Sequence, residues 1–332
     1  MDVSVVCPVF NTPPDLLRRA AESVLRERLA VRELILVDDA SDDPATLAAC
    51  HALREADARV VLHRLPRNAG PASARNAGLR LATASWVGFL DADDLWLPGR
   101  IESTEALLEL HPDACWIGGP HSFISGEADD TARQPAPALV GRMGHAGAKW
   151  PVRLKGPALT RLLIADFCMH LGAMLARRDL LLRAGGFAEG LSYYEDFLMM
   201  AKLSVLAPLH YLPEPVYGWR RGNAGLTTSR ARLKGHALRM HRLAAADPLL
   251  QGFRRELRWA SYQARKGLAL NNLLAGRRAH ALGFAFSALA LDPRELREFG
   301  VFLRLWLQGT GAAAAEGNRY SAAERFQVRA NA

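Results

Sequence analysis

Acidic pairs after apolar segments could bind a nucleotide and a metal ion. Asp91 and Asp93 lie two residues apart after the apolar segment 86–90, and Asp38 and Asp39 follow a second apolar segment. Carboxylates are hard oxygen ligands that suit Mg²⁺ or Mn²⁺, and an ion held by one or two of them can still bind a diphosphate. A carboxylate can also accept the imide N–H of a uracil base. Solvated turn residues and helix caps are the alternative interpretation of both pairs.

Arg75 is a cation that the same site could use. It lies on a predicted helix, 71–82, whose neighbouring side chains are small or apolar. Burying a guanidinium there is costly unless an anion pairs with it. A diphosphate or the Asp91 cluster would supply that anion, and an Arg that extends to solvent is the alternative.

Alternating apolar segments and helical patterns indicate how these residues are positioned. The predicted strands are 3–7, 33–37, 59–63 and 86–90, and the predicted helices are 16–25, 44–53 and 71–82. This order favours a mostly parallel sheet covered on both faces, in which ligands bind beyond the carboxyl ends of the strands. The polar clusters follow those ends, so we expect them to converge on one edge of the sheet.

Four segments together resemble the successive signatures of family 2 glycosyltransferases. They are 5–11, 36–42, 68–76 and 89–94. The resemblance implies an α/β fold of the GT-A type, with a Rossmann-like, mostly parallel sheet flanked by helices. It also implies inversion at the anomeric carbon, a nucleotide-sugar donor and a divalent metal, Mn²⁺ or Mg²⁺. It assigns nucleotide-sugar binding to Pro8, Phe10, Asn11, Asp38, Asp39, Asn68, Gly70, Arg75 and Asp91, and metal binding to Asp91 and Asp93.

The second half of the chain resembles the acceptor half of the same family. Segments 167–178 and 184–187 are similar to its strand and Gly-Gly-Phe turn, and 193–198 is similar to its Glu-Asp motif. The resemblance makes Asp196 the catalytic base and Glu195 an acceptor-binding neighbour. An inverting transfer needs a base, because the acceptor hydroxyl loses its proton as its oxygen attacks. An acidic helix N-terminus favoured by the macrodipole is the alternative.

Trp219 is assigned to the acceptor site by a weaker likeness. The family segment that matches 217–223 often ends in His, and Gly222 stands at that place here. A plain surface loop is therefore the alternative for this segment.

Composition along the chain suggests its division into regions. The segment 125–160 is rich in Gly, Pro and Ala and too long for an ordinary connection. Helical patterns without strands follow, and the Ala-rich end is typical of a frayed terminus. We expect a GT-A domain at 1–230, with a nucleotide-sugar half at 1–120, a variable loop at 125–160 and an acceptor half at 160–230, then a basic helical extension at 231–308 and a disordered tail at 309–332.

The positive charge belongs to the last third of the chain. The formal charge of the 332 residues is +8, yet residues 1–230 carry 25 Lys and Arg against 27 Asp and Glu, while 231–332 carry 17 against 7. Several of these cations lie on one helical segment beside apolar and aromatic residues: Arg254, Arg255, Arg258, Arg265 and Lys266. Such a helix can lie against anionic lipid, or it can be a solvated helix packed on the protein.

The cysteines, histidines and apolar segments mainly argue against particular features. The four cysteines are widely spaced, with no Cys-x-x-Cys pair and no His at metal-ligand spacing, so we expect neither a disulfide framework nor a zinc site. The ten histidines form no other recognisable constellation. Neither a signal peptide nor a membrane span is expected, which predicts a cytoplasmic protein with peripheral contact at the inner face of the membrane as an option.

The leading functional hypothesis is therefore an inverting, metal-dependent glycosyltransferase. We expect it to use a UDP-sugar and a saccharide or lipid-linked saccharide acceptor in envelope polysaccharide synthesis. A nucleotidyltransferase acting on a sugar phosphate is one alternative, but it should carry a Gly-rich loop with Arg and Lys directly after the first strand, where this chain has 8–11. A nucleic-acid-binding protein that uses the basic tail is another alternative. No nucleic-acid-binding motif is recognised, however, so we do not expect nucleic acid as a partner.

Overall fold

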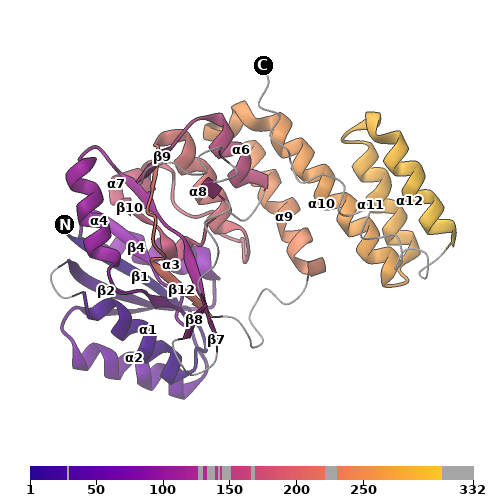
Figure 1. Ribbon diagram of the computed structural model, residues 1–332. Helices are drawn as coiled ribbons and strands as arrows, with labels where there is room; N and C mark the ends of the chain where they lie inside the picture. The colour runs from indigo at the N-terminus through magenta and orange to yellow at the C-terminus, as the bar shows by residue number, and fades with distance from the viewer. Residues whose placement is uncertain are drawn as a thin grey trace. The chain divides into compact units, whose positions relative to one another are not determined.

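The chain folds into two compact units, Met1–Asn223 and Ala224–Ala332 (Figure 1). The computed structural model describes residues 1–27, 30–125, 130–132, 139–140, 143, 151–165, 169–220 and 230–308. The expected tail at 309–332 and the departure at Gly222 lie outside these residues.

The first unit is built on an eight-stranded, mostly parallel sheet. Its strands in spatial order are β3 (Val60–Arg64), β2 (Val31–Asp38), β1 (Val3–Val9), β4 (Trp86–Phe89), β10 (Leu175–Arg177), β6 (Trp116–Gly118), β11 (Leu209–Tyr211) and β9 (Val152–Leu154). β10 and β9 run antiparallel to their neighbours, and the other pairs are parallel. β1 and β2 bury almost all their side chains, as strands covered on both faces do. The predicted mostly parallel sheet flanked by helices is confirmed.

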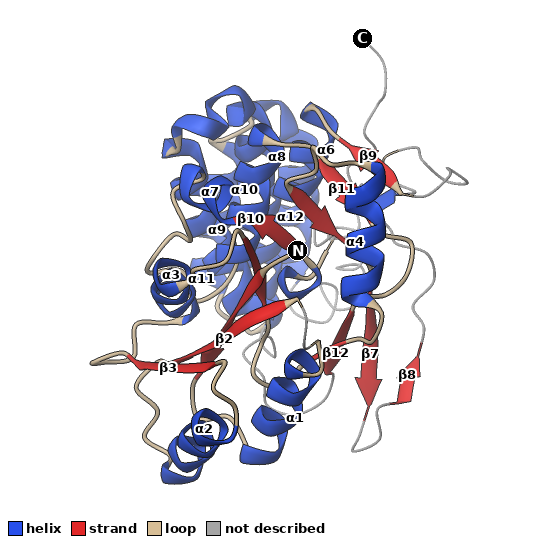
Figure 2. Ribbon diagram, turned by 90° about the vertical axis from the view of Figure 1, so that its left-hand side faces the viewer, coloured by secondary structure: helices blue, strands red, loops and turns tan. Residues whose placement is uncertain are grey.

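Three helices cover the two faces beside β2 and β3. Figure 2 shows α1 (Pro14–Leu25) and α2 (Pro44–Ala56) on one face and α3 (Pro71–Leu81) on the other. Each of these helices begins with a proline, whose fixed φ suits the first helical turn and whose missing N–H is not needed there. Asp43 also caps α2 by accepting the N–H groups of Ala45 and Thr46. A helix that starts with proline thus follows each of the strands β1, β2 and β3.

A smaller, four-stranded sheet lies beside the large one. Its order is β5 (Leu95–Trp96), β12 (Tyr217–Arg220), β7 (His121–Ser125) and β8 (Asp130–Ala132). Other helical segments in the described part of the first unit are α4 (Arg100–Leu110), α6 (Pro157–Ala165), η1 (Leu171–Ala173), α7 (Arg178–Arg183) and α8 (Glu195–Leu206). The expected variable loop at 125–160 is wrong for much of its described part, because β8 and β9 are strands and α6 begins inside it. β9 pairs with β11 and forms an edge strand of the large sheet.

Three non-glycine residues among the described ones have left-handed backbone conformations. They are Asn11 (φ 47°), Ala40 (φ 58°) and Tyr194 (φ 65°). A side chain makes this region costly, so it persists only where surrounding structure imposes it. Asn11 and Ala40 follow the carboxyl ends of β1 and β2, and Tyr194 precedes α8.

The second unit is helical throughout its described part. Its elements are α9 (Arg230–Ala246), η3 (Pro248–Phe253), α10 (Arg254–Leu274), α11 (Arg278–Leu289), η4 (Pro293–Glu295) and α12 (Leu296–Gln308). Small alanines of α10 and α11 let the helices approach, and Phe302 and Leu305 of α12 complete the core. Among the described helices, none combines the length and the apolar character needed to cross a bilayer.

Candidate active site

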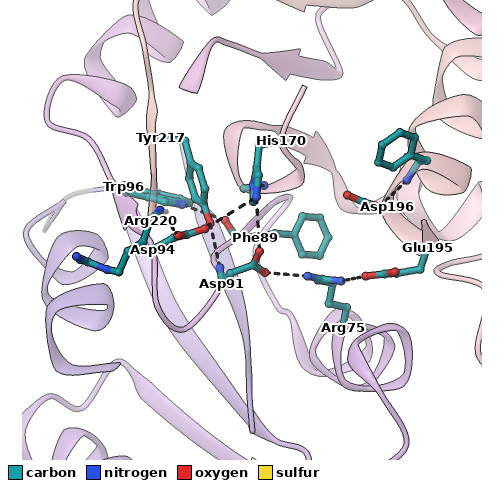
Figure 3. A network of polar contacts seen from close by, with 12 residues as sticks. Arg75, Phe89, Asp91, Asp94, Trp96, His170, Glu195, Asp196, Tyr217 and Arg220 are labelled. Atoms are coloured by element: carbon teal, nitrogen blue, oxygen red, sulfur yellow. Dashed lines mark hydrogen bonds and ion pairs between the residues drawn. The ribbon is translucent and has the colours of Figure 1, made fainter. Parts of the chain in front are cut away.

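Arg75 lies buried between two carboxylates that come from distant parts of the chain. Its guanidinium contacts Asp91 Oδ1 at 2.8 Å and Glu195 Oε1 at 2.5 Å (Figure 3). Asp91 follows the carboxyl end of β4, Arg75 is on α3 and Glu195 starts α8. This chain of ion pairs joins the end of the parallel sheet to the segment that carries Asp196.

The charges of Arg75 and Asp91 stabilise each other in a buried setting. Burial alone would lower the pKa of Arg75 and raise that of Asp91, but their mutual attraction reverses both effects. The pKa of Arg75 is therefore raised and that of Asp91 lowered, so both groups are charged at neutral pH. Asp91 is thus one of the anions expected for Arg75, and Glu195 is a partner that was not expected. The interpretation of Arg75 as a solvent-exposed Arg is wrong, because its exposed fraction is 6%.

Asp94 and Tyr217 fasten the small sheet to this network. The Tyr217 hydroxyl donates to Asp94 Oδ2 at 2.7 Å and accepts the N–H of Asp91 at 3.2 Å. Asp94 Oδ1 accepts the N–H of Arg220 at 2.7 Å. Burial, together with the charges of Asp91 and Asp93, raises the pKa of Asp94 well above its usual range. Asp94 therefore acts as a structural junction between the end of β4 and β12.

His170 lies next to the carboxylates of Asp91 and Asp94 and is part of the same network. Its Nε2 lies 3.8 Å from Asp91 Oδ2 and 3.9 Å from Asp94 Oδ2, and its ring stacks on Tyr217 at 4.6 Å. Its Nδ1 accepts the N–H of Gly172 at 3.1 Å, so in the neutral ring the proton sits on Nε2. Burial lowers the pKa of His170 to about 4, which keeps the ring neutral.

A buried cation supports the segment that carries His170. Arg100 of α4 is 1% exposed, and it donates to the carbonyl oxygens of Gly172 at 2.6 Å and Met174 at 2.9 Å. Its guanidinium also lies 3.9 Å from the centre of the Trp96 ring. Burial lowers the pKa of Arg100 to about 9. These contacts fix η1, and with it the position of the imidazole.

The oxygen ligands at the end of β4 fit a divalent cation. Asp91, Asp94 and His170 offer ligand atoms within 4.8 Å of one another, and Asp93 stands exposed beside them. The Asp94 oxygens already accept two hydrogen bonds, and His170 would have to move its Nε2 proton before it could ligate. The charged Asp91 and the exposed Asp93 are therefore the better ligands in this arrangement, and they suit Mg²⁺ or Mn²⁺.

Asp196 sits at the start of α8, next to the Arg75–Glu195 ion pair. Its Oδ1 accepts the N–H of Phe197 at 2.8 Å. Burial, and then the neighbouring charge of Glu195, raise the pKa of Asp196 to about 7. A carboxylate with such a pKa can take up a proton at neutral pH and release it again.

The acidic pair after β2 is occupied by contacts within the protein. Asp38 is 1% exposed, pairs with Arg64 at 3.0 Å and accepts the N–H of Ser41. Asp39 accepts the N–H groups of Ala69 at 2.7 Å and Gly70 at 2.8 Å. Both carboxylates thus shape the loops at this edge. Each oxygen of Asp39 has further acceptor capacity, so its assignment to the base stays a prediction.

Other residues assigned to the nucleotide lie along the same strand ends. Asn11 accepts the N–H groups of Asp42 and Asp43 and donates to Asp42 Oδ1, so it holds the loop after β2 against the end of β1. Pro8 is in β1, Phe10 is 47% exposed just after it, and Asn68 is exposed before Gly70, the N-cap of α3. In the described part of the chain, Arg75 and Asp91 form their hydrogen bonds and ion pairs with other residues than these.

Trp219 belongs to an aromatic group on the small sheet. Its ring lies 5.3 Å from His170, 5.5 Å from His121 and 5.5 Å from Phe123, measured between ring centres. Glu195, the other residue assigned to the acceptor, is only 6% exposed and is engaged by Arg75. A positioning role therefore suits Glu195 better than direct acceptor contact.

The sequence reasoning missed His170, Asp94 and Tyr217 as members of the site. The third acid of the run at 91–94 was a signal for Asp94, since an acid so close to two others calls for a partner. Nothing in the sequence around His170 or Tyr217 marks them, because the acids that they contact, Asp91 and Asp94, lie 76 or more residues away in the chain. The expectation that the histidines form no functional cluster is wrong for His170, which lies next to Asp91 and Asp94.

The chain belongs to glycosyl transferase family 2, whose family model matches residues 4–181, more than half of the chain. Succinoglycan biosynthesis protein ExoW of Rhizobium meliloti (strain 1021) is 32% identical over 185 residues, which are 54% of this chain and 56% of that protein. Uncharacterized protein y4gI of Sinorhizobium fredii (strain NBRC 101917 / NGR234) is 27% identical over 252 residues, 74% of this chain and 25% of that protein. The chain thus spans between a quarter and just over half the length of these curated relatives.

A solved structure shares the fold. The crystal structure of S. aureus TarS 1-349 in complex with UDP-GlcNAc aligns with a TM-score of 0.63 and 17% identity, covering 96% of this chain and 92% of that one. At this identity the likeness concerns the fold alone. It confirms the GT-A arrangement that the sequence motifs predict, and the family prediction is confirmed by the family model.

Proposed function

We propose that the protein is a metal-dependent, inverting glycosyltransferase that moves a sugar from a UDP-sugar to a saccharide or lipid-linked saccharide acceptor in envelope polysaccharide synthesis. The observation that carries the proposal is Arg75, buried between Asp91 and Glu195. One cation thereby couples the acidic end of β4 to the start of α8, where Asp196 has a pKa of about 7. Family membership supports the reaction class. The UDP-GlcNAc in TarS and the succinoglycan role in the name of ExoW support the donor and product classes.

The donor would lie along the carboxyl ends of β1, β2 and β4. In this proposal Pro8, Phe10, Asn11, Asp38, Asp39, Asn68 and Gly70 border the base and ribose. Asp91 and Asp93 would hold Mn²⁺ or Mg²⁺, which when bound neutralises charge on the diphosphate leaving group. Arg75 keeps Asp91 ionised and oriented for that task.

Asp196 would act as the base on the acceptor side. Its carboxylate takes the proton of the acceptor hydroxyl while that oxygen forms a bond to the anomeric carbon. The bond between this carbon and the diphosphate breaks on the opposite face, and the nucleoside diphosphate leaves with the electron pair. Glu195 would position this step, since its ion pair with Arg75 fixes the first turn of α8. Trp219 is the proposed acceptor contact on the small sheet.

A cytoplasmic location with contact to the inner face of the membrane completes the proposal. Arg254, Arg255 and Arg258 of α10 are exposed, as attraction to anionic lipid requires. Lys266, which belongs to the same cluster of cations, is 4% exposed and pairs with Glu298 at 2.7 Å, so it is not available to lipid. The competing interpretation of α10 as a solvated helix predicts no lipid binding.

A thermal-shift screen of nucleotide sugars with and without Mn²⁺ tests the donor and the metal together. A UDP-sugar should raise the Tm more with Mn²⁺ than without it. The Asp93→Ala variant should lose the Mn²⁺-dependent part of this Tm increase. The Asp15→Ala variant, which replaces an exposed acid at the start of α1, should keep it. An Asp93→Ala variant that responds to Mn²⁺ like the wild type would overturn the metal assignment.

A further inference from the structure

A second cluster of potential metal ligands lies away from the site just described. His111 and Asp113 are in the turn between α4 and β6, and His210 is in β11, which pairs with β6. One ligand atom of each lies within 4.8 Å of those of the other two. Because β6 runs parallel to β4, the turn before β6 is at the opposite end of the strands from Asp91.

His210 has an unusual environment for a polar side chain. It is 0% exposed, and its ring nitrogens have no hydrogen bond of ordinary length and angle with the described residues. The only polar group that acts on the ring as a hydrogen-bond partner among them is the backbone of Trp116, and that contact falls outside ordinary geometry. Buried polar groups are nearly always well paired, so a buried ring without a hydrogen bond of ordinary geometry calls for an explanation. The ring of His111 lies 5.1 Å from it, between centres. The two imidazoles face each other without bonding.

We propose that His111, Asp113 and His210 form a binding site for a zinc-type divalent transition-metal ion. Two imidazole nitrogens and one carboxylate are a donor set typical of Zn²⁺, with a fourth position left for water, and they are a poor set for Mg²⁺ or Ca²⁺. The ion would give the buried ring of His210 a stronger partner than its poorly aligned contact with the Trp116 backbone. It would also fasten the end of α4 and the turn before β6 to β11.

The geometry requires small side-chain movements. A tetrahedral ion about 2.0–2.2 Å from each ligand holds the ligand atoms roughly 3.3 Å apart. His210 is fixed in its strand, whereas His111 is half-buried and Asp113 exposed in a turn, so these two can rotate toward it. The ion pair of Asp113 with Arg153, at 3.8 Å, is exposed on both sides and weak.

The protonation states suit a metal ligand. Burial, with His111 and Arg153 nearby, lowers the pKa of His210, so its ring is neutral at pH 7. A neutral imidazole offers the lone pair that a metal ion needs. The expectation that the chain has no zinc site rested on the spacing of cysteines and histidines along the sequence, and that spacing does not reveal histidines that folding brings together.

Measurement of Zn²⁺ binding to the full chain tests the proposal. Mg²⁺ and UDP are added so that they occupy the candidate active site. Equilibrium dialysis at about one equivalent of Zn²⁺, with metal analysis, should find one tightly bound ion per wild-type chain, and the ion should raise the Tm by about 5 °C or more. Co²⁺ in its place should give visible absorption bands of a four-coordinate site.

Three variants make the outcome decisive. His111→Ala and Asp113→Asn, both changes in an accessible turn, should each weaken Zn²⁺ binding at least tenfold and remove the Tm increase. His51→Ala changes an exposed histidine of α2 and should leave both unchanged. Folded His111→Ala and Asp113→Asn proteins that bind Zn²⁺ as tightly as His51→Ala would overturn the proposal, and so would a wild type without the tight ion.

Discussion

At Asp196, the protonation of one carboxylate links stability to chemistry. Its pKa is raised to about 7 by burial and by Glu195. Between the ordinary pKa near 4 and this value, the folded protein holds a proton that the unfolded chain has lost. Stability therefore falls as the pH rises through this range, while the fraction of Asp196 able to accept a proton grows.

The pH dependence of transfer should report this carboxylate. We expect kcat/KM to rise between pH 5 and pH 8 with an apparent pKa near 7, because only the ionised form can act as the base. Initial rates with a saturating metal ion, measured across this range, check it. A rate that is flat from pH 5 to pH 8 would show that Asp196 is not the base.

Asp196→Asn should separate activity from stability. We expect transfer to fall about 10²–10⁴-fold with nucleotide binding retained. At pH 8 the free energy of unfolding should rise by about 1–2 kcal/mol, because a destabilising charge is removed. Denaturant titrations at pH 3 supply the internal control, since Asp196 is then protonated in both the folded and the unfolded wild type and the difference should vanish. Loss of nucleotide binding in the folded variant would make Asp196 a binding residue instead.

Arg75→Lys keeps the charge but cannot bridge two carboxylates. A single ammonium reaches one of Asp91 and Glu195 and leaves the other buried without its partner. We expect a loss of about 3 kcal/mol in the free energy of unfolding and a fall in kcat of more than tenfold. Arg80→Lys, on the exposed side of the same helix, should change both by little. Equal effects of the two substitutions would contradict the bridging role.

At the scale of elements, the sequence was informative about strand ends and uninformative about cross-chain contacts. The polar residues after β1, β2 and β4 were placed correctly at one edge, because a buried strand must end where polar residues begin. Tyr217 and His170 could not be predicted in the same way. Their roles arise from strand pairing in the small sheet and from the position of η1, which depend on packing between distant segments.

Gly172→Ala tests how closely two of these elements approach. A Cβ at Gly172 would overlap the ring of Tyr217, which holds Asp91 and Asp94 in place. We expect a loss of about 1–3 kcal/mol in stability and weaker nucleotide binding. Gly283→Ala, the same change in open space on α11, should raise stability by up to about 1 kcal/mol. Thermal unfolding of both variants, with and without UDP, measures these differences, and a neutral Gly172→Ala would contradict the close approach.

At the scale of the whole molecule, charge separates along the chain. The cations of α10 that remain exposed, Arg254, Arg255 and Arg258, lie in the helical second unit. Replacing all three by Gln should reduce binding to vesicles with phosphatidylserine by about tenfold or more at low salt, and leave transfer to a soluble acceptor unchanged. Vesicle sedimentation over a salt series measures it. Equal sedimentation of the variant and the wild type would favour a solvated helix.

The three left-handed residues have a consequence for protein engineering. Asn11, Ala40 and Tyr194 border the ends of β1 and β2 and the start of α8, so conformational cost is concentrated where the site residues gather. Consensus or thermostability design usually targets loops, and at Ala40 a glycine would relieve about 1 kcal/mol of this cost. The same change would give the loop after β2 more freedom. A more heat-tolerant variant obtained there is therefore expected to hold its donor less firmly.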